Sequence, residues 1–283
     1  MSSRTSPTER QRRLGRELRK MRLAAEVSAE TAAGLLGVDR SRLSNIEQGI
    51  RAISEDRVLT LARACTCQDQ PYVEALAAMA RRARRGWWER YRDSLPDGLL
   101  DIAELEAHAL RMRSAHSVHI PGILQTSDHA LAVFRVVVPT LPEHEVALRL
   151  AHRVERQEVL EGTTPPEYTG VIHEAALRMQ FGGRKVARVQ LDHLLTASES
   201  LHVTLRVIPF EAGAFPGAGQ TVNYAEGPTP QLDTVQVDST HGPEFLDGEE
   251  QLAKYRSHLD WMERIALSPR ESRDFIHGIA RHL

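Results

Sequence analysis

Residues 28–49 read SAETAAGLLGVDRSRLSNIEQG. The pattern predicts two short helices joined by a tight turn: the first is capped by Ser28, and the second runs over residues 40–48. At the turn, Gly37 supplies the positive φ that a sharp reversal needs, and Asp39 caps the helix that follows. Two helices joined in this way cross steeply, so their contact requires small side chains on one helix and apolar side chains on the other.

The inward positions of this stretch meet that requirement. They are Ala32, Ala33 and Leu36 on the first helix, and Val38, Leu43 and Ile46 at or on the second. The spacing Ala33-(three residues)-Gly37-(five)-Leu43-(two)-Ile46-Glu47-(one)-Gly49 resembles the Xre/Cro-like helix-turn-helix family. The resemblance implies a unit that binds double-stranded DNA with the second helix in the major groove.

The exposed face of the second helix carries side chains that can recognise bases. Arginine pairs with guanine, asparagine with adenine, and serine with either base. By position in the family motif, we expect base contacts from Arg40, Ser41, Ser44 and Asn45. We expect phosphate contacts from Ser28, Arg42, Gln48 and Arg51. The motif departs from the family at Ala29, where a glutamine often holds the DNA backbone, so this contact is missing or is supplied by Ser28 or by the backbone amide of Glu30.

Charge divides the chain in two. Residues 1–92 contain 19 Lys and Arg against 11 Asp and Glu, net +8, whereas residues 93–283 contain 17 against 27, net −10. Because phosphate attracts the first part and repels the second, we expect only the first part to meet DNA. Arginine-rich helix faces that are merely solvated would give the same counts, but the helix-turn-helix spacing favours the DNA interpretation.

Amphipathic helices flank the motif. Leu14, Leu18 and Met21 have helical spacing before it, with the neighbouring arginines expected mostly on the exposed surface, and Val58, Leu59, Leu61 and Ala62 follow it. A further helical pattern runs from Tyr72 into an arginine run at 81–85 and the pair Trp87-Trp88. We therefore predict an N-terminal five-helix helix-turn-helix domain, with its DNA-binding unit at residues 1–68, and a basic helical connector at 69–92.

Residues 93–283 alternate between helical patterns and short β-branched stretches. Helical patterns lie at 101–115, 126–138, 143–160, 173–180, 184–200, 249–267 and 269–282, and strand patterns lie at 168–172, 202–209, 220–224 and 234–238. Strands that cluster between helices predict an α+β domain with a small, mostly antiparallel sheet. The whole chain is therefore predicted to be mainly α.

Several segments of this half resemble the actinobacterial Scr1-type antitoxin-like and WhiJ-like regulators, in which an Xre-like head precedes a second domain. The most specific segment is Ile120-Pro-Gly-Ile-Leu-Gln-Thr126, and others are Arg153-Val-Glu-Arg-Gln157 and His173-Glu-Ala-Ala-Leu177. The resemblance implies a bacterial regulator that acts with a small protein encoded by a neighbouring gene.

Two sets of residues in the second domain are candidates for a ligand or partner site. They are Pro121, Gly122, Gln125 and Thr126 before one helix, and Arg153, Arg156 and Gln157 on adjacent turns of another. Each set has an architectural alternative: a rigid turn that feeds a capped helix, and a salt-bridge face. The residue types alone leave both interpretations open.

Other chemistry has little support in the sequence. All 13 histidines lie at or beyond His108 without the His-Glu-x-x-His spacing, and the one-residue gap between Cys65 and Cys67 suits neither a framework disulfide nor a zinc site. We therefore expect no metal and no cofactor. Because no nucleophile elbow, phosphate-binding loop or dinucleotide fingerprint occurs, we expect no enzyme, although a triad assembled across space stays open.

The first residues and the apolar runs of the chain indicate a cytoplasmic location. The longest apolar run, 131–141, is interrupted by Arg135 and Pro139, and residues 1–13 lack the apolar core of a secretory signal. We therefore expect a cytoplasmic protein without membrane contact.

These observations favour a sequence-specific DNA-binding transcription regulator that binds two half-sites as a homodimer. Its C-terminal domain is expected to sense a small protein or a small-molecule effector. One alternative is the antitoxin of a toxin–antitoxin-like pair that represses its own operon. A remote alternative is an enzyme tethered to DNA.

Overall fold

The computed structural model describes residues 6–81, 86–217 and 220–283. Most of the 81–85 arginine run of the predicted basic connector, residues 82–85, therefore lies outside the described residues. The chain divides into two compact units: the first comprises Met1–Trp87 with Pro228–Leu232, and the second comprises Trp88–Gly227 with Asp233–Leu283.

The described part of the first unit contains five α-helices, as the sequence predicts. They are α1 (Glu9–Ala24), α2 (Ala29–Leu35), α3 (Arg40–Glu47), α4 (Glu55–Ala64) and α5 (Gln70–Ala80). Their shared core buries every apolar position expected inside, including Leu18, Leu43 and Leu61, with Val38 and Leu59 partly buried. The α5 helix, within the stretch predicted as a connector, adds Leu76 to this core.

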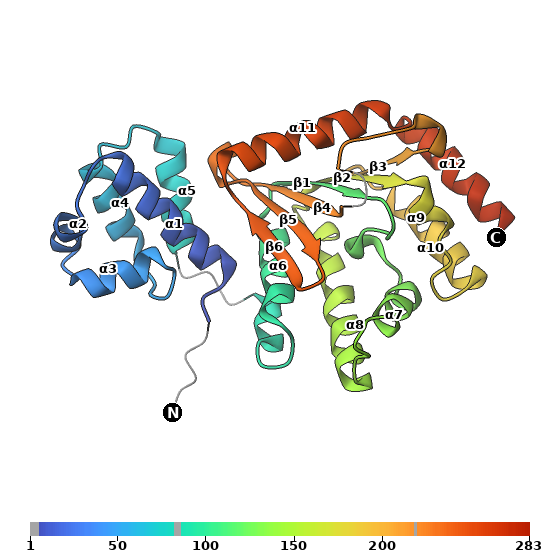
Figure 1. Cartoon of the computed structure of the whole chain (residues 1–283), viewed down its shortest axis with the longest axis horizontal. Helices are drawn as coiled ribbons and strands as arrows, with labels where there is room; N and C mark the ends of the chain where they lie inside the picture. Colours follow the sequence, from blue (N-terminus) through green and yellow to red (C-terminus); the bar gives the residue numbers. More distant parts are fainter. Residues whose placement is uncertain (1–5, 82–85, 218–219) are drawn as a thin grey trace. The chain divides into compact units, whose positions relative to one another are not determined.

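The second unit is an α+β domain around a six-stranded sheet (Figure 1). Its strands are β1 (Arg111–His116), β2 (Glu167–His173), β3 (Val203–Ile208), β4 (Val222–Glu226), β5 (Thr234–Ser239) and β6 (Gly242–Leu246). Its helices are α6 (Asp97–His108), α7 (Ser127–Arg135), α8 (Glu143–Gln157), α9 (Glu174–Arg178), α10 (Arg184–Ala197), α11 (Glu249–Ile265) and α12 (Pro269–His282). The predicted fold class is confirmed.

The sheet is mixed, with the order β3-β2-β1-β4-β5-β6. Strands β1, β2 and β3 are parallel, and β4, β5 and β6 pair antiparallel from β1 outward. The parallel half arises because α7 and α8 connect β1 to β2, and α9 and α10 connect β2 to β3, and helical crossovers of this length return a strand in the same direction. Three of the five strand pairings are therefore antiparallel, as the sequence predicts, and the two parallel pairings lie together in the first half of the sheet.

Strand β1 lies where the sequence predicts a helix. Residues 101–115 have good helix formers throughout, but α6 ends at His108 and the chain continues as a central strand. Tertiary pairing on both edges of β1 overrides local helix propensity. Alternation along β1 then sends Met112 to one face of the sheet and Ala115 to the other.

Two apolar clusters cover the two faces. Met112, Tyr168 and Ile172 pack with residues of α10 and α12, while Ala115 and Val171 pack with residues of α11. Figure 1 shows α11 running along one face of the sheet, with α6 and α8 on the other. Within residues 6–81, 86–217 and 220–283, every helix is too short or too polar to traverse a bilayer.

Candidate DNA-binding surface

Side-chain hydrogen bonds cap the starts of both α2 and α3. Ser28 Oγ accepts from the Thr31 N–H (3.0 Å) at the start of α2, and Asp39 Oδ1 accepts from the Arg42 N–H (2.6 Å) at the start of α3. Between them, Gly37 has φ +62°, a conformation that a side chain disfavours. The turn chemistry predicted from the sequence is thus present.

Helix α1 holds the end of α3 at close range. A β-carbon on Gly15 would lie 2.5 Å from the carbonyl oxygen of Glu47, and one on Gly49 would lie 2.7 Å from the backbone nitrogen of Arg12. Glycine at both positions therefore permits backbone-to-backbone packing that any other residue would obstruct.

A buried ion pair reinforces this contact. Arg22 on α1 donates to Glu47 through Nε (2.6 Å) and Nη2 (3.0 Å), and its Nη1 donates to the Val27 carbonyl (2.9 Å). Hydrogen bonding to Glu47 raises the pKa of Arg22. Arg13 is likewise buried and pairs with Glu17 at 3.0 Å. These two arginines are exceptions to the exposed position expected for the arginines of the first helix.

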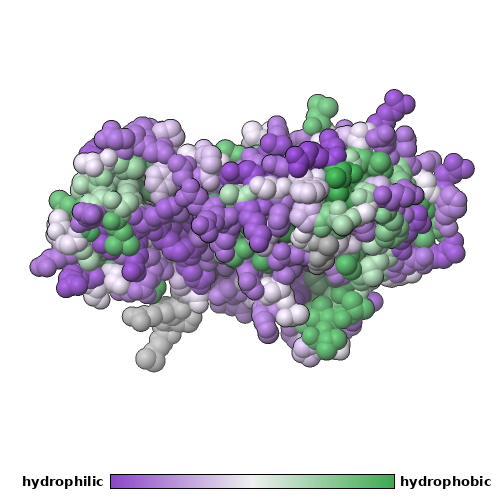
Figure 2. Space-filling model, turned by 45° about the horizontal axis from the view of Figure 1, so that its top comes forward, coloured by the Kyte–Doolittle hydropathy of each residue, from purple (hydrophilic) through white to green (hydrophobic). Residues whose placement is uncertain are grey.

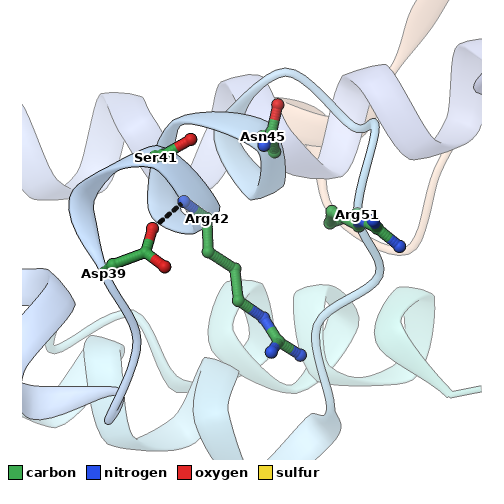
Figure 3. Close-up of a pocket in the computed structure, with 5 residues that line it drawn as sticks. All are labelled: Asp39, Ser41, Arg42, Asn45 and Arg51. Atoms are coloured by element: carbon green, nitrogen blue, oxygen red, sulfur yellow. Dashed lines mark hydrogen bonds between the residues drawn. The ribbon is translucent and has the colours of Figure 1, made fainter.

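A polar hollow opens beside the exposed face of α3. It has a volume of about 340 Å³ and is lined by Asp39, Ser41, Arg42, Asn45 and Arg51. Figure 3 shows Ser41 and Asn45 projecting from α3, with Arg51 approaching from the loop that follows. That loop is folded back because the Arg51 N–H donates to the Asn45 carbonyl (3.1 Å). The hollow thus presents two guanidinium groups and an amide on one surface.

The remaining predicted contacts lie on α3 or directly after it, except Ser28, which precedes α2. Arg40 and Ser44 are exposed, and Asn45 is half-buried. Gln48 Nε2 donates to Ser44 Oγ (2.9 Å), so the predicted phosphate-contacting and base-contacting residues are linked to each other. Ser28 already caps α2 through its hydroxyl oxygen. Hydrophilic residues dominate the face of the first unit seen in Figure 2.

Sequence reasoning did not select two residues that shape this site. Asp39 was expected as a cap and also lines the hollow, and Glu47 fixes the end of α3 from inside. The sequence held one signal for Glu47, which was its place in the family motif. By residue type alone, a charged residue between Ile46 and Gly49 would be expected on the surface.

In the second unit, two candidate residues of α8, Arg153 and Gln157, bond to the buried Gln125. The side chain of Gln125 donates through Nε2 to the Ile120 carbonyl (2.7 Å) and accepts at Oε1 from Arg153 Nη1 (2.6 Å). The backbone carbonyl of Gln125 accepts from Gln157 Nε2 (2.5 Å). The neighbouring Thr126 caps α7. These bonds tie the turn at Pro121 and Gly122 to α8.

Arg156 has a different partner. Its guanidinium makes two bonds to Glu106 of α6, at 2.8 Å and 2.5 Å, and burial leaves its side chain 8% exposed. Arg156 therefore links α8 to α6, whereas Arg153 faces the turn.

Comparison with protein families separates the two units. A model described as "Domain of unknown function (DUF5753)" matches residues 99–278. The chain belongs to this family. A second model, described as a helix-turn-helix domain, matches residues 13–76 of this DUF5753 protein. The comparisons with curated proteins and with solved structures found no match. The helix-turn-helix match supports DNA binding by the first unit and a role in transcription regulation.

Proposed function

We propose that this DUF5753 protein is a sequence-specific transcription regulator that reads its operator with α3. The observation that carries the proposal is the polar hollow, where Asn45, Arg42 and Arg51 share one exposed surface. Amide and guanidinium groups are the side chains best suited to adenine, guanine and phosphate. Arg40, Ser41 and Ser44 extend the base-reading surface along the same helix.

The test is to select a binding site from random double-stranded DNA with the full chain and then to compare variants on the selected site. Asn45→Ala and Arg40→Ala remove proposed base contacts, and Arg51→Ala removes a proposed phosphate contact. Arg63→Ala is the matched control, because Arg63 is an exposed arginine of α4 outside the hollow. Unchanged selectivity in both base-contact variants would show that α3 does not read the site.

We infer further that the regulator acts as a homodimer. One helix-turn-helix contacts few base pairs, and units of this kind bind two half-sites about one DNA turn apart. A selected site with two-fold symmetry, together with a dimer mass by light scattering, is the expected result. A monomer that protects a single half-site would contradict it.

The second unit is proposed to be the effector-binding part of the regulator, without catalytic activity. Its net charge of −10 over residues 93–283 makes it a poor DNA ligand. The resemblance to Scr1-type and WhiJ-like regulators favours a small protein as partner, and a small molecule is the alternative. Co-purification of the full chain with the product of an adjacent short gene would favour the protein partner, and a toxic product would favour the antitoxin alternative.

A further inference from the structure

A group of histidines gathers at the carboxyl end of β1. His116 ends the strand, His119 follows it, and His129 lies in the first turn of α7. The ring of Phe181 joins the last two, with its centroid 5.0 Å from that of His119 and 5.4 Å from that of His129. We call His119, His129, Phe181 and the adjacent Arg153 the histidine–arginine cluster.

The position of this cluster in the sheet is typical of a ligand site. Strand β1 has a parallel neighbour, β2, on one side and an antiparallel neighbour, β4, on the other. In open sheets with parallel strands, ligands bind outside the carboxyl ends of the strands, where the strand order reverses. The cluster lies at this end of β1.

Polar atoms of the cluster are buried without partners. His129 is 1% exposed, yet neither of its ring nitrogens has a hydrogen-bond partner among the described residues. The same holds for His119 Nδ1 and Arg153 Nε within that part of the chain. Buried nitrogen atoms are nearly always paired in folded proteins, because an unpaired one lowers stability.

Arg153 is held in place while this nitrogen stays unpaired. Its Nη1 donates to Gln125 Oε1 (2.6 Å), and its guanidinium carbon lies 4.4 Å above the ring of Phe134. Burial lowers the pKa of Arg153 to about 9, so the guanidinium remains charged at neutral pH. Asp238 is exposed to solvent near the end of β5, and its negative charge acts to raise the pKa of Arg153 against the larger effect of burial.

We infer that the histidine–arginine cluster is a binding site for a small organic molecule with a carboxylate or phosphate group. An oxyanion accepts from the free Nε–H of Arg153 and from a ring N–H of His119 or His129, and Phe181 offers an apolar wall for the rest of the molecule. A metal ion is the weaker alternative, because the described residues contain no group of three His, Cys, Asp or Glu side chains placed to hold one. The inference rests on the proposed effector role of the second unit and names the ligand class.

The test is a calorimetric titration of the full chain with inorganic phosphate and, separately, with acetate, in a chloride buffer of constant ionic strength. We expect saturable binding of at least one anion, and the tighter of the two identifies the phosphate or carboxylate class. Arg153→Gln should weaken binding at least tenfold. Arg149→Gln is the matched control, because Arg149 lies one turn earlier on α8 and pairs with Glu145 at 2.6 Å.

His129→Leu gives a second, independent readout. Replacing the unpaired imidazole by an apolar side chain of similar size should raise the melting temperature of the anion-free protein and weaken anion binding at least tenfold. Arg153→Lys keeps the charge but lacks the Nε–H, and it should also weaken binding. No saturable binding of either anion, or equal affinity in all variants, would overturn the inference. Operator binding by the wild-type chain is a separate measurement that tests the first unit. A failed anion titration would therefore leave the proposed DNA-binding function standing.

Discussion

Arg22 on α1 and Glu47 at the end of α3 form a two-bond ion pair whose side chains are 8% and 7% exposed. The pair joins the first helix of the unit to the last residue of the proposed recognition helix. Because the Arg22 guanidinium also holds the Val27 carbonyl, one side chain fixes both the end of α3 and the approach to α2. The position of the DNA-reading surface thus depends on a contact buried beneath it.

Glu47→Ala should destabilise the first unit strongly. Removing one partner leaves Arg22 buried and unpaired, which costs about 3–5 kcal/mol. The measurement is urea unfolding of the full chain, in which the unfolding transition of the helical first unit is monitored. The double variant Arg22→Met with Glu47→Leu should recover most of the loss, because an apolar pair needs no desolvated charge. Equal stability of the single and double variants would show that the unpaired charge of Arg22 is not the cause of the loss.

Gly15→Ala should also destabilise the first unit, although alanine is the better helix former by about 1 kcal/mol. The added carbon would meet the Glu47 carbonyl oxygen at 2.5 Å and would force α1 away from α3. Gly34→Ala on α2 is the control, because no atom lies within 4 Å of its added carbon. That variant should be stabilised by up to about 1 kcal/mol in the same urea titration. A stabilised Gly15→Ala variant would contradict the close packing of α1 on α3.

The two classes of proposed DNA contact should differ in their salt dependence. Asn45→Ala should cost about 1–3 kcal/mol on the selected site and little on random DNA, since a base contact is lost. Arg51→Ala should weaken both and reduce the slope of log K against log salt by about one unit, since a phosphate contact is lost. Mobility-shift titrations at several chloride concentrations measure both effects. A slope unchanged by Arg51→Ala would exclude Arg51 from the phosphate contacts.

The first unit was largely predictable because its information is local. Leu14, Leu18 and Met21 repeat at helical spacing, and Gly37 marks the turn, so helices and core follow from neighbouring residues. The burial of Arg22 was not predictable in this way. Its partner lies 25 residues away, and although Leu14, Leu18 and Arg22 share one helix face, that spacing does not identify the partner.

The second unit was less predictable because its sheet depends on distant pairings. Strand β1 pairs with residues more than 50 positions later on one edge and more than 100 on the other, so its helix-forming composition misled the local prediction. The histidine–arginine cluster has the same origin. Phe181 reaches His129 only through the fold, and no motif spacing connects them. Arg153 was a candidate from the sequence, but its buried histidine neighbours were not.

The stability of the second unit should fall as the pH drops below about 6.5, the ordinary value for histidine. Burial lowers the pKa of His116 and His129 to about 4, and burial with the charges of Arg156 and Arg153 lowers that of His152 to about 3. Between these values and 6.5 the unfolded chain binds more protons than the folded one, so the free energy of unfolding rises with pH in this window. Each histidine steepens that rise by up to about 1.4 kcal/mol per pH unit.

The measurement is urea unfolding from pH 4 to 8. His152→Phe, which keeps a ring against Tyr91, should flatten the profile below pH 6.5, whereas His277→Ala on the exposed face of α12 serves as the control. A profile that His152→Phe leaves as steep as the wild type would assign the acid sensitivity to other groups.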